Sequence, residues 1–317
     1  MSENILDAID IARPLVDGPQ RGLDTSIRLG WELTEPREIT GVPHLPNAAR
    51  RDPRELSSTE CMALIDDFGR VGVSHVDISG GEPTVREGFW DLLTHATGHR
   101  ISVGFSTCGA GITPSAAATI ATSGRVDVRI ALAGATEVAN DAVAGPGSYR
   151  TAVRAMELFA SSGVYDFGLS VVVTRHNVGR LDAFAAIADL FGARLRLSLP
   201  QSSGRGAGIG DDHHLLPEQY GDLRRWLRDH GEGVHTGDLS LPLFGDSESL
   251  GSAVGDLGIV ACLIDSIGDV YVRPALGQAA RSAGNVRAPG GFGRIWRNSA
   301  DRSRYDARRT DDLRACS

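Results

Sequence analysis

An alternation of short apolar runs with longer segments of helical spacing constrains this chain most, and it extends from Ser26 to about Leu199. Such an alternation is typical of repeated strand–helix units and a parallel sheet. The predicted strands of six such units are residues 26–33, 73–79, 101–106, 126–132, 167–174 and 194–199. Because a complete barrel has eight units, this pattern predicts an α/β fold with a partial (β/α)6 TIM-like barrel.

The pattern changes after about His230 to glycine- and serine-rich connections, followed by a predicted hairpin. The arms of the hairpin are residues 259–265 and 270–273, and its turn contains Gly268, which can adopt the positive φ of a tight turn. The expected organisation is an N-terminal amphipathic segment (1–25), the partial barrel (26–235) and a short C-terminal extension (236–317).

Charge and hydropathy exclude several classes of partner. The net charge of −8 provides no electrostatic footprint for nucleic acid, and an anionic membrane surface would repel it. No apolar run approaches the roughly 18 residues needed to span a bilayer. The first residues are acidic where a secretory signal would be basic. We therefore expect a cytoplasmic location.

A Gly-Gly-Glu-Pro sequence at residues 80–83 directly follows the second predicted strand. Functional loops of parallel barrels gather at the carboxyl ends of the strands, and paired glycines allow a ligand to approach the backbone closely. On its own, such a sequence is more often a simple turn.

The residues around this loop, 76–86, resemble the S-adenosylmethionine (SAM) loop of radical SAM enzymes. Nearly the whole chain, from about Ile27 to about Trp296, is similar to maturases of the mycofactocin type, which are radical SAM proteins with a cysteine-rich C-terminal extension called SPASM. Blocks that carry the resemblance include residues 31–34, 51–56, 140–143, 145–148, 171–178, 203–207, 262–265, 268–271 and 283–287. The resemblance implies a vestigial SAM site formed by Gly80, Gly81, Glu82, Pro83, Ser106 and Arg205.

The resemblance also places three cysteine ligands of a [4Fe–4S] cluster after the first strand. Those positions are occupied by Arg37, Gly41 and His44. Arginine stays protonated and glycine has no side chain, so they cannot replace thiolates. Ala131 and Ala133 likewise stand where the resemblance leads one to expect polar contacts to the SAM ribose. We therefore expect no cofactor, no cluster and at most weak SAM binding.

The C-terminal extension departs from the family in the same direction. Gly255 and Arg273 stand at positions of expected cysteines, and Cys262 remains. The expectation is a degenerate, truncated SPASM-like extension.

Three further features are open to a functional interpretation. Cys108, at the end of the third strand, is more often a packed residue than a reactive thiol. Residues 211–214, Asp-Asp-His-His, offer metal ligands, although adjacent loop residues rarely point at one ion. Arg175 or Arg205 could clamp a carboxylate, with surface ion pairs as the simpler interpretation.

These observations predict a non-catalytic relative, or pseudoenzyme, of a peptide maturase, which binds a precursor peptide or a homologous active maturase. Two alternatives remain open. One is an enzyme that uses the SAM pocket without a cluster, for example through Glu82 or Cys108. The other is a radical SAM maturase that obtains its cluster through other ligands.

Overall fold

The computed structural model describes residues 27–34, 52–200, 213–230, 234–238, 260–272 and 281–299. These residues form one ten-stranded sheet with the order β10-β9-β8-β1-β2-β3-β4-β5-β6-β7. Its parallel strands in chain order are β1 (Ile27–Glu32), β2 (Val73–Ser79), β3 (Ser102–Thr107), β4 (Val126–Ala131), β5 (Gly168–Val172), β6 (Arg194–Ser198) and β7 (Val234–Asp238). All six predicted strands are present, and β7 is a further parallel strand that the sequence pattern did not indicate.

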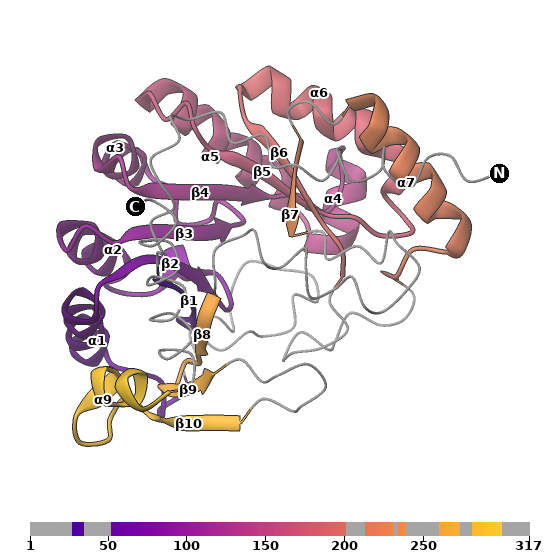
Figure 1. Ribbon diagram of the computed structural model, residues 1–317. Helices are drawn as coiled ribbons and strands as arrows, with labels where there is room; N and C mark the ends of the chain where they lie inside the picture. Colours follow the sequence, from indigo (N-terminus) through magenta and orange to yellow (C-terminus); the bar gives the residue numbers. More distant parts are fainter. Residues whose placement is uncertain are drawn as a thin grey trace, which may run out of the picture.

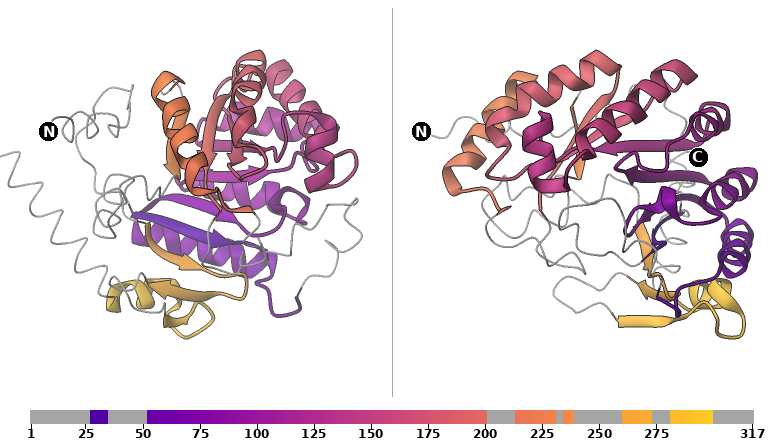
Figure 2. Two further views of the ribbon diagram at one scale, coloured as in Figure 1. Left: turned by 90° about the vertical axis from the view of Figure 1, so that its right-hand side faces the viewer. Right: turned by 180° about the vertical axis from the view of Figure 1, so that it is seen from behind.

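Helices cover the outer, convex side of this curved sheet, as Figures 1 and 2 show. They are α1 (Ser58–Val71), α2 (Phe89–Gly98), α3 (Pro114–Ser123), α5 (Ser148–Ser162) and α6 (Leu181–Phe191), with α4 (Glu137–Ala144) and α7 (Pro217–His230) near the far end of the sheet. Within the described residues, no helix is both long enough and apolar enough to cross a membrane.

The two faces of the sheet differ in chemistry because successive side chains of a strand point to opposite sides. The outward side chains are apolar and buried against the helices, as Leu29, Val76 and Phe105 illustrate. The inward positions of the same strands carry polar, charged or very small residues. The six-unit partial barrel predicted from the sequence is thus confirmed as an α/β fold with a polar inner face.

The C-terminal strands extend the sheet next to β1. Strand β8 (Val260–Ile264) pairs in parallel with β1, and β9 (Asp269–Val272) and β10 (Arg281–Asn285) follow in antiparallel order. The predicted hairpin is therefore present as β8 and β9. Asp265 stabilises its turn by accepting hydrogen bonds from the backbone N–H groups of Ile267 (3.1 Å) and Asp269 (2.8 Å). The domain division expected near residue 235 remains a prediction.

An aromatic cluster joins this C-terminal segment to the barrel. Phe68 of α1 is fully buried and makes edge contacts with Trp31 of β1 and with Phe292 of α9 (Gly291–Asn298), at ring-centroid distances of 5.9 Å and 5.1 Å. One ring therefore connects a strand, a covering helix and the C-terminal helix.

Replacing this ring tests how much the junction contributes to stability. We predict that Phe68→Ala lowers the free energy of unfolding by about 3–5 kcal/mol, the usual cost of removing a buried phenylalanine side chain. Leu190→Ala, on the 76% exposed Leu190 of α6, should change it by less than about 0.5 kcal/mol. Urea denaturation of both variants measures the two effects, and equal losses would contradict the assigned packing.

Candidate functional site

The carboxylate of Glu82 holds together the loops that follow β2 and β3. Its Oε1 accepts hydrogen bonds from the Thr84 backbone N–H (3.1 Å) and the Thr107 hydroxyl (2.6 Å). The Thr84 hydroxyl also donates to Oε1, and the Cys108 backbone N–H donates to Oε2 over 2.7 Å. Four donors on one carboxylate make Glu82 a bracing residue between two neighbouring strand ends.

Glycines at the end of β2 allow the first two strand ends to meet. Gly80 has a φ of +114°, and a Cβ there would lie 2.2 Å from the carbonyl oxygen of Thr34. The backbone N–H of Gly81 donates to the Thr34 hydroxyl over 2.9 Å. In the structure, the residue that approaches this backbone closely is Thr34, just after β1, whereas the sequence predicted the approach of a ligand. The SAM-binding role of residues 80–83 stays a prediction.

Two buried asparagines brace the ends of β4 and β5 in the same way. The side-chain oxygen of Asn140 accepts from the backbone N–H groups of Ala133 (2.8 Å) and Gly134 (3.2 Å). The side-chain nitrogen of Asn177 donates to the carbonyl oxygens of Ala133 (3.2 Å) and Val172 (2.9 Å). The sequence blocks that contain these asparagines therefore shape the loops of the carboxyl edge.

Charged side chains form what we call the inner belt on the concave face of the sheet. Its members come from β1, β2, β4 and β6 and are Arg28, His75, Asp77, Asp127, Arg129 and Arg196. Asp77 lies 3.1 Å from Nη2 of Arg129 and 3.0 Å from Nε2 of His75, and Arg196 donates to Asp127 over 2.9 Å. Gly104 makes room for this network, since a Cβ there would lie 2.4 Å from Oδ1 of Asp77.

The pKa of Asp77 reflects its interactions with the basic side chains of the inner belt. Burial raises this pKa, but the hydrogen bond from His75 and the positive charges of His75, Arg129 and Arg28 outweigh burial and lower the pKa to about 2. The carboxyl group is therefore ionised in the folded protein at neutral pH.

Nearer the carboxyl edge, the inner face carries small side chains that are open to solvent. Ser79, Ser106 and Ala131 lie on this face and are exposed, and we call them the open shelf. The predicted position of Ser106 at the strand edge is confirmed, whereas its contact with a ligand stays a prediction. Ala131 lacks a polar group here, as the sequence suggested.

The described cysteines are poorly suited to bind metal or to react. Burial, foremost, and the adjacent negative charge of Glu82 raise the pKa of the Cys108 thiol to about 12, so the thiol is protonated at neutral pH. Cys61 and Cys262 are buried in the core. Within the described residues, no three cysteines gather at one point.

The remaining sequence candidates fall into two groups. The Nε of Arg175 donates to the His214 carbonyl oxygen over 3.2 Å, and the His213 ring lies edge-on to His176 with centroids 5.7 Å apart. Outside the described residues lie Arg205, the Asp-Asp pair at 211–212 and the cluster positions Arg37, Gly41 and His44.

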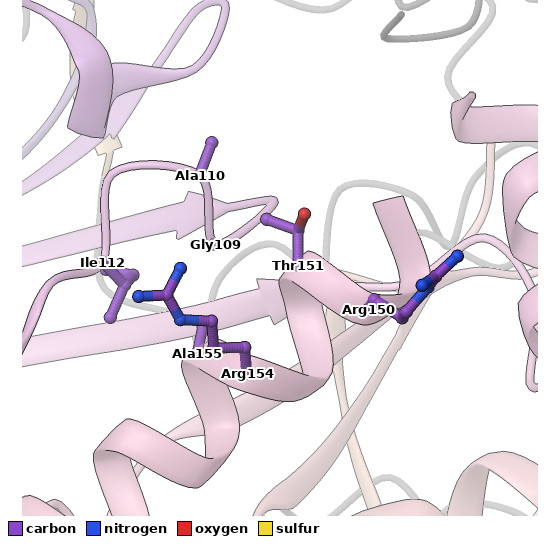
Figure 3. Close-up of a pocket in the computed structure, with 7 residues that line it drawn as sticks. All are labelled: Gly109, Ala110, Ile112, Arg150, Thr151, Arg154 and Ala155. Carbon is purple, nitrogen blue, oxygen red and sulfur yellow. The ribbon is translucent and has the colours of Figure 1, made fainter. Parts of the chain in front are cut away.

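A small cavity beside the β3–α3 loop was not indicated by the sequence. It has a volume of about 180 Å³ and lies between residues 109–112 and helix α5. Figure 3 shows the Arg154 side chain extending toward the loop and the Arg150 side chain extending away from it. Arg150 pairs with Glu137 of α4 over 2.8 Å.

A parallel partial barrel with a Gly-Gly-Glu-Pro loop after β2 defines the class of protein. The radical SAM superfamily model matches residues 37–186. The chain is 46% identical over 288 residues to mycofactocin maturase MftC of Mycobacterium ulcerans, which covers 90% of this chain and 78% of the relative. The chain therefore belongs to the radical SAM superfamily, within the group of mycofactocin maturases.

Solved structures share the fold at low sequence identity. SuiB of Streptococcus suis, bound to precursor peptide SuiA, has a TM-score of 0.63 at 14% identity, over 88% of this chain and 66% of SuiB. The protein anSMEcpe, with bound AdoMet (SAM) and a peptide, has a TM-score of 0.60 at 16% identity, over 88% of this chain and 82% of anSMEcpe.

Family membership contradicts the expectation that this chain takes no cofactor. Radical SAM relatives use SAM and a [4Fe–4S] cluster as cofactors, so these are the cofactors that the family indicates for this chain. When bound, the two groups together supply radical chemistry. The expectation was wrong because it rested on a few substituted positions, those of the cluster, of the SAM ribose contact and of the C-terminal cysteines, whereas nearly the whole chain is similar to relatives that use these cofactors. By contrast, the described cysteines offer no set of three thiolates for a cluster.

The low pKa of Asp77 leads to a prediction about acid stability. A carboxyl whose pKa falls from its ordinary 3.8 to about 2 on folding stabilises the protein above about pH 3.8, and this contribution disappears as the pH falls toward about 2. We predict that Asp77→Asn makes the loss of stability over this window shallower. Urea unfolding at a series of pH values tests this, with Asp222→Asn on an exposed ion pair as control. Parallel curves for the wild type and Asp77→Asn would contradict the coupling.

Proposed function

We propose that this chain binds a ribosomally made precursor peptide on its inner face, and that peptide recognition, without radical turnover, is its role in peptide maturation. We also propose that it does so in the cytoplasm. The similar mycofactocin maturases give the peptide-maturing context. The structural neighbours SuiB and anSMEcpe, whose structures contain a bound peptide, support the same kind of ligand.

The observation that carries the proposal is the combination of the inner belt with the open shelf. The belt runs from β1 to β6, and at about 4.8 Å between neighbouring strands this is a span of about 24 Å. An extended peptide of about seven residues has the same length. Exposed serines along this span can hydrogen-bond to a peptide backbone, beside belt charges that already pair with one another.

The absence of turnover is supported by the sequence of the loop after β1. Arg37, Gly41 and His44 occupy the positions at which the family resemblance places three cysteines. Loading the protein with iron, sulfide and SAM is therefore part of the experiment that tests turnover.

An enzyme that works through Cys108 or Glu82 is not favoured. The Cys108 thiol is protonated at neutral pH because of its raised pKa of about 12. The Glu82 carboxylate already accepts four hydrogen bonds from its own loops. A homologous active maturase is the other partner expected from the sequence, and it would be found in the same binding experiment.

Peptide binding can be measured on the full-length chain after anaerobic loading with iron, sulfide and SAM. We predict saturable binding of a precursor peptide of the mycofactocin type, measured by calorimetry, with no change in peptide mass after reduction. Ser106→Trp, which fills the open shelf, should weaken binding about tenfold or more, a loss of about 1.4 kcal/mol. Ser161→Trp, at an exposed position on the outer helix α5, is the matched control and should bind like the wild type.

Each part of the proposal has its own contradicting result. A peptide of altered mass would overturn the claim of no turnover. Equal affinities of Ser106→Trp and wild type would exclude the inner face as the binding surface. If the chain binds a homologous active maturase but does not bind the precursor peptide, the proposed peptide-binding role is wrong.

A further inference from the structure

Two histidines and an aspartate converge on the outer helical surface. Asp66 lies on α1, His95 on α2, and His99 directly after α2. One oxygen of Asp66, Oδ1, lies 2.7 Å from Nε2 of His95 and 3.0 Å from Nε2 of His99. The three potential ligand atoms all lie within 4.8 Å of one another. No sequence argument singled out this group, because its members come from two helices.

Local packing explains why the two rings face the same carboxylate. Residues four apart on a helix lie on one side, so His95 and His99 share a face. Their rings meet edge-on with centroids 4.9 Å apart. Gly69 of α1 provides the space for His99, since a Cβ there would lie 2.7 Å from Nδ1 of that ring. Helix α1 thus provides the Asp66 carboxylate and, at Gly69, the space that the His99 ring occupies.

We propose that Asp66, His95 and His99 bind a divalent transition-metal ion of the Zn²⁺ class. Two imidazole nitrogens and one carboxylate oxygen are ligands that Zn²⁺ prefers, and three protein ligands leave the fourth tetrahedral position to water. Bonds of about 2.1 Å place tetrahedral ligand atoms about 3.4 Å apart. The distances from Oδ1 of Asp66 to Nε2 of His95 (2.7 Å) and to Nε2 of His99 (3.0 Å) therefore need to lengthen only slightly.

The exposure of the three side chains allows this movement and gives the ion access. Their exposed fractions are 43% for Asp66, 34% for His95 and 36% for His99. Metal binding would replace two N–H···O hydrogen bonds by three coordination bonds, and the Nε2 atoms of His95 and His99 would release their protons to solvent as they bind the ion.

The position of the cluster indicates a structural role for the ion. His99 lies just before β3 begins at Ser102, and α1 ends at Val71, just before β2 begins at Val73. The site is therefore near the amino ends of the strands, the end of such barrels that contributes stability, whereas functional loops occupy the opposite end. A bound ion would link α1 to α2 there.

The test uses untagged, full-length protein that has been freed of metal with a chelator and then titrated with ZnCl₂ by calorimetry. The wild type should bind one equivalent of zinc. His95→Gln and His99→Gln should bind zinc at least about tenfold more weakly. Gly69→Ala, which displaces the His99 ring without removing a ligand, should also weaken this equivalent. His230→Gln alters a histidine that stacks on Trp226, away from the cluster, and should bind like the wild type.

A second readout separates coordination from a loss of folding. Cobalt(II) should give the visible absorption of a tetrahedral site in the wild type and in His230→Gln, and lose it in both ligand variants, while circular dichroism shows all four proteins folded. Zinc binding that is unchanged in His95→Gln and His99→Gln would overturn the proposal. A wild-type protein that binds no zinc would overturn it as well.

Discussion

The alternation of apolar and polar side chains along the parallel strands is the constraint on which the rest of this structure depends. Outward residues such as Trp31 and Phe105 are buried, so helices must cover that face. Inward residues such as Asp77 and Arg129 are charged, and burying them without partners would cost far more than the sheet gains. The inner face therefore satisfies its charges through its own ion pairs and retains exposed positions near the carboxyl edge.

Buried polar side chains then shape the edge at which the strands end. Glu82 connects the loops after β2 and β3, while Asn140 and Asn177 hold the ends of β4 and β5. Leaving one buried donor unsatisfied costs about 1–3 kcal/mol, so each bracing residue matters to the loop geometry. The loop that contains Glu82 and the two blocks that contain Asn140 and Asn177 are thus explained by the need to form this edge. The same architecture can be retained whether or not turnover occurs.

Local periodicity was sufficient to predict the strands β1 to β6 and the β8–β9 hairpin, because each depends on a pattern within a few residues. It could not place β8 beside β1, since that pairing joins Arg28 to Val260, far apart in the sequence. It also missed β7, a short strand of five residues with the sequence Val-His-Thr-Gly-Asp.

The candidate site was predictable to a lesser degree. Residues 80–83 and Ser106 were placed at the strand ends from sequence alone, but the inner belt required the register that brings Asp77 next to Gly104. The cluster of Asp66 with His95 and His99 required the packing of α1 on α2. The expectation of no cofactor was wrong because a few substituted positions outweighed the similarity of nearly the whole chain to its family.

The central claim is that the inner face of the sheet receives a peptide. Hydrogen–deuterium exchange of the full-length protein, with and without the precursor peptide, tests it most directly. Our account predicts slower exchange at the strand-end loops 80–85, 107–112 and 133–136, with no change in the outer helices α2 and α3. Protection confined to those outer helices, with the strand-end loops unchanged, would contradict it.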